Sequence, residues 1–126
     1  MADYENLPGR IKRVAETELQ QNEHIDLCVL GRSSVLRPDY VIITSLRILV
    51  IDERDMGSLA ISYTNIRCNL FYSEIIAVKL ARLLKHRLLG QARLEINVKR
   101  NVHWIDNLSY AEAKQVHSYI DAKIQN

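Results

Sequence analysis

Residues 92–99 read ARLEINVK, and this stretch decides the fold class because apolar and polar side chains alternate in it without a break. Successive side chains of a β-strand point to opposite faces, so a period of two residues separates a buried face from a solvent face. The stretch therefore predicts a strand with one face in a core and a charged face toward solvent.

The chain after this strand predicts a hairpin and then a helix. Asn101 suits a hairpin turn, and residues 102–107 return as a final strand around Trp104, whose ring we expect in the core. Ser109 and Glu112 have the S-x-x-E spacing of a capping box, which marks a helix start. The predicted C-terminal helix presents an apolar stripe that must pack on something: Ala113, Val116, Ile120 and Ile124.

Upstream, short apolar runs alternate with turn signals. Residues 7–21 predict a helix with Pro8 in its first turn, and its apolar face packs either on its own domain or on another protomer. Residues 52–57 read as a turn. The predicted strands are residues 25–29, 40–44, 46–51, 59–63 and 66–70.

Residues 74–89 fit two structures. As a helix they have Ser73 as N-cap and Gly90 as stop, and their basic amphipathic character suits an anionic membrane. As a strand they place Ile76 and Val78 in a sheet, followed by a loop through residues 85–87. The flanking strands favour the second interpretation.

The order is therefore helix, about seven short strands, helix, with turn signals about every 8–12 residues through the middle. This order predicts a mainly β (α+β) domain, a closed or nearly closed antiparallel barrel or sandwich capped by the C-terminal helix. Residues 1–24 form an N-terminal helical extension, and residues 25–126 form the domain itself.

Three segments resemble the bacterial pleckstrin-homology-like (bacterial PH) domains. Residues 40–51, YVIITSLRILVI, are similar to that family's motif of apolar strand, Thr, polar residue, any residue, Arg and apolar strand. Residues 71–78, FYSEIIAV, are similar to the start of its fifth strand, and residues 102–124 to its last strand and capped helix. The resemblance implies a PH-like seven-stranded barrel or sandwich with an extra N-terminal helix, and a binding or scaffolding module that carries out no reaction.

Basic residues concentrate between positions 79 and 100, although the formal net charge of the chain is only +2. Seven basic residues and one acidic residue, Glu95, give this stretch a net +6 against −4 for the rest of the chain. Such a basic stripe attracts anionic partners, or it is simply the solvated face of a sheet. The seven are Lys79, Arg82, Lys85, Arg87, Arg93, Lys99 and Arg100.

Two arginines further upstream complete the candidate lipid site. Basic residues near the first two strands hold phosphates in eukaryotic pleckstrin-homology domains, and Arg32 and Arg37 occupy that region here, without the tight Lys-x-Arg arrangement. The candidate anion or lipid contacts are Arg32, Arg37, Lys79, Arg82, Lys85 and Arg87.

Motifs of catalysis or metal binding are missing from the sequence. It has no Gly-rich phosphate loop, no G-x-S-x-G elbow, and no Cys or His residues at zinc-ligand spacing. Cys28 and Cys68 lie in apolar runs and suit buried positions, with a bridge between them left open. We therefore expect no enzymatic activity, no cofactor and no bound metal.

The composition and the apolar segments of the chain indicate which partners and which location to expect. Aromatic residues make up 6% of the chain and none lies between Lys79 and Arg100, so we expect no nucleic acid. No stretch approaches the roughly 18–20 apolar residues of a membrane span, and residues 1–20 lack the apolar segment of a signal peptide. We expect a cytoplasmic protein.

Two functions stay open. The first is a self-associating scaffold or protein-binding module, a homo-oligomer or one half of a complex, in which strand edges or charged sheet positions meet a neighbour. The alternative is peripheral binding to anionic membrane lipid through the basic stripe at residues 79–100.

Overall fold

The computed structural model describes residues 4–32, 38–56 and 61–125, apart from the side chains of residues 54–56 and 61–63. Its helices are α1 (Gly9–Glu18), α2 (Leu84–Leu89) and α3 (Tyr110–Ile124), with 3-10 turns η1 (Tyr4–Asn6) and η3 (Tyr72–Glu74). Its strands are β1 (Ile25–Gly31), β2 (Asp39–Thr44), β3 (Arg47–Met56), β4 (Ile61–Phe71), β5 (Ile75–Ala81), β6 (Gln91–Val98) and β7 (Asn101–Ser109).

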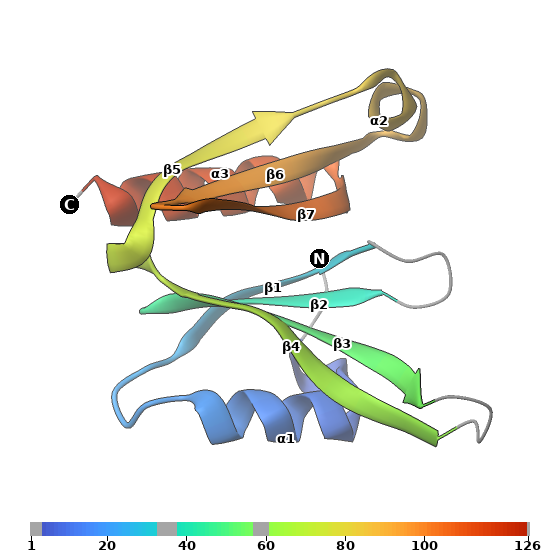
Figure 1. Cartoon of the computed structure of the whole chain (residues 1–126), viewed down its shortest axis with the longest axis vertical. Coiled ribbons are helices and arrows are strands. Elements are labelled where there is room, and N and C mark those ends of the chain that lie inside the picture. The colour runs from blue at the N-terminus through green and yellow to red at the C-terminus, as the bar shows by residue number, and fades with distance from the viewer. Residues whose placement is uncertain (1–3, 33–37, 57–60, 126) are drawn as a thin grey trace.

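The strands form two antiparallel sheets, one of four strands in the order β1-β2-β3-β4 and one of three in the order β5-β6-β7. The chain passes from the first sheet to the second through η3, and the helices lie outside the strands (Figure 1). The described strands remain two separate ladders, so the fold is mainly β and sandwich-like; of the barrel or sandwich predicted, a closed barrel is not formed by the described strands.

The main core lies between the sheets and is covered by α3, which lies behind β6 and β7 in Figure 1. Ser109 caps the start of this helix as predicted, because the Glu112 N–H donates to Ser109 Oγ at 3.2 Å; the Ser109 hydroxyl in turn donates to Oε1 of Glu112, in place of the second bond of a capping box. The predicted alternation in β6 is confirmed, since Ala92, Leu94 and Ile96 are buried between more exposed polar neighbours and Val98 is partly buried. Fully buried members of the core include Ile43, Ile48, Leu94, Ile96 and Ile120.

A second core lies on the other face of the first sheet, where α1 packs (Figure 1). Ile11 and Ala15 of α1 are fully buried against Ile42 and Leu49 of the sheet. Both faces of β2 and β3 are therefore covered, which explains why these strands are apolar at consecutive positions. Of the two packing arrangements open for the N-terminal helix, the structure has it on its own domain.

A buried ion pair joins Glu23, in the segment between α1 and β1, to Arg47 at the start of β3. Nε and Nη2 of Arg47 donate to the two carboxylate oxygens of Glu23 at 2.9 and 2.8 Å, and Nη2 also donates to the Glu18 carbonyl at 2.8 Å. The Thr44 hydroxyl donates to Glu23 and accepts from the backbone N–H groups of Leu46 and Arg47. Thr44 and Arg47 are three residues apart in residues 40–51, and this spacing lets both side chains bind the Glu23 carboxylate.

The two sheets approach each other closely where β1 meets β7. The Arg32 N–H donates to the Asp106 carbonyl at 2.8 Å, and Asn107 Nδ2 donates to the Arg32 carbonyl at 2.7 Å. A Cβ atom on Gly31 would lie 3.0 Å from the Asp106 carbonyl oxygen, so glycine permits this approach. Asn107 has a φ of 57° and lies where the pairing of β7 with β6 is irregular, between Ile105 and Leu108.

Two sequence predictions, for the segments that form β3 and β4, were wrong. Residues 52–56, predicted as a turn, continue β3, and residues 61–71 form one strand where two were predicted; the parts of these predictions that fall on residues 57–60 lie outside the described residues. Residues 74–89 contain both structures considered, because strand β5 is followed by α2 at the positions predicted as a loop. Gly90 ends α2 with a φ of 67°, as expected of a helix stop.

Neither cysteine forms a disulfide, and both are buried. Cys28 belongs to the core under α1 and Cys68 to the core between the sheets. Burial raises the pKa of the Cys68 thiol to about 11. Both residues therefore act as small core side chains, as the sequence predicts.

Candidate functional site

The helix α2 is inverted relative to an ordinary surface helix, in which apolar side chains face the core. Its buried residue is the polar His86, with 0% of its surface exposed, whereas three of its leucines, Leu84, Leu88 and Leu89, are 70–76% exposed. Leu83, which precedes the helix, is 50% exposed. Clustered exposed apolar side chains of this kind mark interaction sites.

His86 fixes the orientation of α2. The Leu83 N–H donates to Nδ1 of His86 at 2.9 Å, so Nδ1 carries no proton and Nε2 does. Nε2 then donates to Oδ1 of Asp106 on β7 at 2.7 Å. At 3.6 residues per turn, Leu84 and Leu88 are each about 200° from His86 around the helix axis and so point away from the sheet.

Asp106 gathers basic residues around this anchor. Its Oδ2 lies 3.4 Å from Nζ of Lys85 and 3.4 Å from Nη2 of Arg93. Burial disfavours the charged form of Asp106, but hydrogen bonds from His86 and Arg93 outweigh it and hold its pKa below the ordinary value. The carboxylate is therefore ionised near neutral pH and binds the cations around it.

The structure brings four of the six candidate lipid contacts to one end of the molecule. Arg87 is exposed on α2, Lys85 is 52% exposed in its side chain, and Arg32 lies beside Asp106. Arg82 is half-buried, with Nε donating to the Gln91 carbonyl at 2.9 Å and its guanidinium 4.0 Å from the ring centroid of Tyr110.

The two remaining candidates do not join this group. Lys79 lies in the middle of β5, where it pairs across the sheet with Glu95. Arg37 lies outside the described residues. The sequence identified the basic residues at this end of the molecule, but it did not identify the exposed leucines as part of the same surface, because a loop was expected there.

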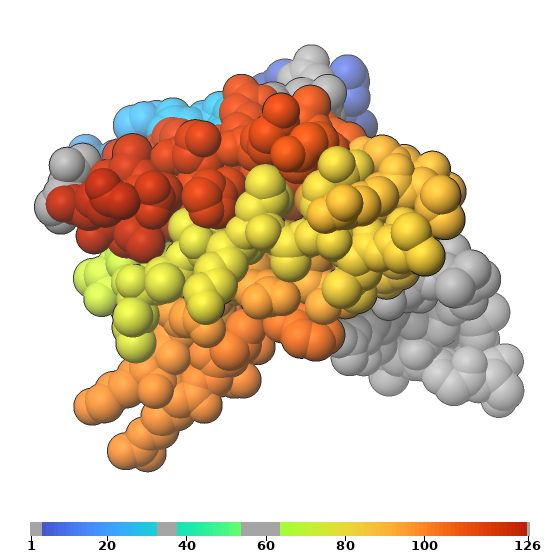
Figure 2. Space-filling view, turned by 90° about the horizontal axis from the view of Figure 1, so that it is seen from above, coloured from blue at the N-terminus to red at the C-terminus, as the bar shows by residue number. Residues whose placement is uncertain are grey.

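Figure 2 shows α2 in amber as a projection at one end of β5, with the turn between β6 and β7 projecting at the other side of the view. The outer face of the β5-β6-β7 sheet lies between these features. Trp104 belongs to that outer face and is 51% exposed, so its predicted place in the core was wrong. It pairs with Glu95, whereas His103, one residue earlier, pairs with the buried Ile96.

Trp104 is linked to α2 by a series of contacts. The Arg93 guanidinium lies 4.0 Å from the ring centroid of Trp104, and Arg93 also contacts Asp106, which binds His86 and Lys85. The exposed indole is therefore connected through Arg93 and Asp106 to the buried side of the helix that carries the exposed leucines.

The strand edges of the second sheet are partly covered. His117 of α3 lies with Nε2 3.1 Å from the Val78 carbonyl on β5, and Arg67 donates to the Trp104 carbonyl on β7 at 3.2 Å. These contacts occupy backbone groups that an added strand would need.

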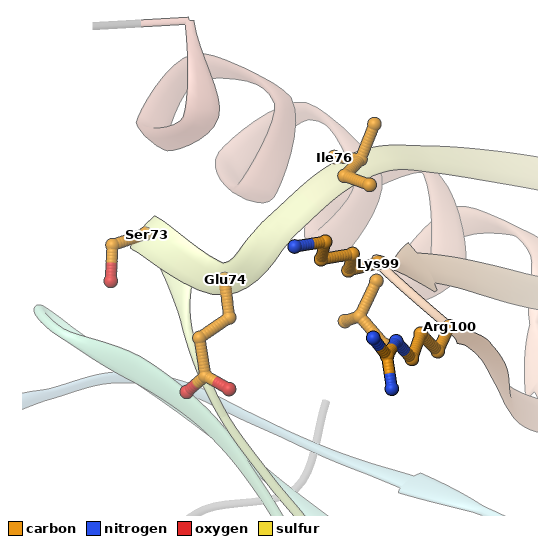
Figure 3. A pocket seen from close by; sticks show the side chains of 6 residues that line it. Ser73, Glu74, Ile76, Lys99 and Arg100 are labelled. Atoms are coloured by element: carbon orange, nitrogen blue, oxygen red, sulfur yellow. The ribbon is translucent and has the colours of Figure 1, made fainter.

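A shallow hollow lies at the start of β5, on the far end of the sheet from α2 (Figure 3). It has a volume of about 580 Å³ and is lined by Ser73, Glu74, Ile76, Val98, Lys99 and Arg100. Its polar side chains are exposed and carry both signs of charge, so it lacks the buried, convergent polar groups of a small-molecule site.

Among the described residues, no three His, Cys, Asp or Glu side chains are grouped so that they could hold a metal ion. None of the helices described is both long and apolar enough to cross a membrane.

Comparison with known proteins returns nothing: no protein-family model, no curated protein and no solved structure matches this chain.

Proposed function

We propose that this protein is a non-enzymatic binding module of pleckstrin-homology-like type that docks on anionic membrane surfaces through α2. The observation that carries the proposal is the inverted helix, whose leucines face solvent beside Lys85 and Arg87. The two sheets and the C-terminal helix support the fold type, because they follow the strand order expected of that family.

The leucines supply the apolar part of docking. Burying a leucine side chain fully contributes about 1.5–3 kcal/mol, and three of the leucines on α2 leave most of their surface in water. One turn and a half of helix cannot cross a bilayer, but it can lie in the headgroup region with Leu84 and Leu88 pointing into the lipid.

The cations supply the electrostatic part. Each Lys or Arg near an anionic leaflet contributes about 1 kcal/mol, and cytoplasmic leaflets carry such lipids. Arg87 and Lys85 lie on α2 itself, and Arg32 lies beside Asp106 at its base. Binding should therefore require anionic lipid and weaken with salt.

A second copy of the chain is the competing partner for the leucines, as in a homo-oligomeric scaffold. A symmetric dimer places the same patch of both copies together. It would bring Arg87 and Lys85 of one copy against those of the other, and like charges in contact disfavour association. The same charges favour an anionic bilayer, which supports the membrane over a second copy as the proposed partner.

The test is co-sedimentation with mixed vesicles, made of two parts phosphatidylcholine to one part phosphatidylglycerol. We expect Leu88→Ser to bind about tenfold more weakly than the unmodified protein, because it removes one inserted side chain. Leu46→Ser is the matched control, since Leu46 is an exposed leucine in the turn between β2 and β3, and it should bind normally.

Light scattering on the same samples separates the partners. If α2 docks on membranes, the protein without vesicles should have the mass of a monomer, 14.6 kDa. A defined oligomer that Leu88→Ser converts to monomer, with no vesicle binding, would instead assign α2 to self-association.

A further inference from the structure

We infer that the outer face of the β5-β6-β7 sheet, which carries Trp104 on its edge strand β7, lies against the same anionic bilayer as α2. This inference rests on the proposed function and extends it from one helix to a whole face of the domain. The juxtaposition that carries it is an exposed indole linked through Arg93 and Asp106 to the helix with the exposed leucines.

The outer face has apolar side chains that the fold leaves uncovered. Trp104 is 51% exposed and Val102 is 44% exposed, and both occupy outward positions on β7. Ile76, at the irregularity where β5 begins, is 66% exposed. An indole with an apolar body and one N–H donor suits the boundary between lipid and water.

The charges of this face fit an anionic partner. Lys79 and Arg93 lie on the outer side of the strands, and Lys99 and Arg100 lie in the turn between β6 and β7. Two acidic residues lie among them: Glu95, which pairs with Lys79 across the sheet, and Asp106, which contacts Arg93. These positions make up most of the basic stripe, so the net positive charge follows the same surface from the β6–β7 turn to α2.

A second copy would also cover Trp104, but it would have to place two positively charged faces together. Anionic lipid removes this conflict because its headgroups neutralise the cations. The bilayer is therefore the occupant that the charges favour, and a dimer through this face becomes an outcome of the test.

Trp104 is the only tryptophan in the chain, so its fluorescence reports on this face directly. The unmodified protein is titrated with the same mixed vesicles of phosphatidylcholine and phosphatidylglycerol while co-sedimentation is measured in parallel. We expect the emission to shift to shorter wavelength as the protein binds. We also expect quenching when brominated phosphatidylcholine replaces the ordinary lipid.

The variant Val102→Ser removes a neighbouring apolar side chain and keeps the fluorophore. It should bind several-fold more weakly, and Leu46→Ser, on a distant turn, should match the unmodified protein.

Co-sedimentation without any change in Trp104 emission would overturn the inference and leave docking through α2 intact. No co-sedimentation at all would overturn both. A shift that appears without vesicles as protein concentration rises would assign the face to a second copy.

Discussion

His86 and Asp106 lie 20 residues apart in the sequence, and Nε2 of His86 donates to Oδ1 of Asp106 at 2.7 Å. This bond connects α2 to β7 and holds the His86 side chain in the buried interior. The leucines of α2 consequently face solvent. The docking surface that we propose therefore depends on a buried hydrogen bond between two polar side chains.

Replacing His86 by alanine should destabilise the protein. The variant leaves the Leu83 N–H and the Asp106 carboxylate without the ring that joins them, which should lower the free energy of unfolding by about 2 kcal/mol. Urea denaturation measures the change. Arg87→Ala, at the next and exposed position, should stay within about 0.5 kcal/mol of the unmodified protein, and equal losses in both variants would contradict the assigned role of His86.

Acid should destabilise the fold through Asp106 and Glu23. Burial disfavours both carboxylates, but hydrogen bonds outweigh it and lower both pKa values: His86 and Arg93 on Asp106, Arg47 and Thr44 on Glu23. A group whose pKa is lowered by folding adds stability above its unfolded pKa, and this stability is lost as the pH falls through the folded pKa.

The free energy of unfolding should therefore stay level near neutral pH and fall below about pH 4. Urea denaturation between pH 7 and pH 3 measures it. Glu23→Gln should lower stability at pH 7 and flatten the acid limb of the curve, and an unchanged acid limb would show that Glu23 contributes nothing to it.

The ion pair of Arg47 and Glu23 should behave as a unit. Arg47→Ala leaves the Glu23 carboxylate, whose side chain is 0% exposed, without its countercharge and should cost about 3–5 kcal/mol. Combining Arg47→Met with Glu23→Leu removes both charges and should recover part of the loss. If the double variant is as unstable as the sum of its single variants in urea denaturation, the two residues are not coupled.

Charge reversal should separate α2 from the rest of the surface. Arg87→Glu and Arg13→Glu make the same change at two exposed positions, one on α2 and one on α1. Binding to anionic vesicles should fall about tenfold or more for the first and change little for the second, because only Arg87 faces the bilayer. Equal losses in a salt-series sedimentation assay would mean that net charge alone governs binding.

The local elements were largely predictable from the sequence. The alternation of residues 92–99 and the Ser109–Glu112 cap report directly on backbone structure, because each depends on neighbours within a few residues. The apolar runs in β2 and β3 also marked strands, but their lack of alternation was a signal that a second layer, α1, covers the first sheet.

Two parts of the site could not be predicted by the same means. Trp104 was expected in the core, but side chains of a strand alternate between its faces, and Ile105 at the neighbouring position is the buried one. Because neighbouring side chains of a strand point to opposite faces, placing Ile105 in the core would have placed Trp104 on the solvent face. The inward turn of His86 depends on Asp106, whose place beside α2 follows from the pairing of β6 and β7 and from no local pattern.

Flotation of the unmodified protein with two kinds of vesicle tests the docking function most directly. The protein should float at low salt with the mixed vesicles of phosphatidylcholine and phosphatidylglycerol, and it should stay at the bottom of the gradient with phosphatidylcholine alone. If it stays at the bottom with both, the exposed leucines and cations of α2 do not form a membrane-docking site.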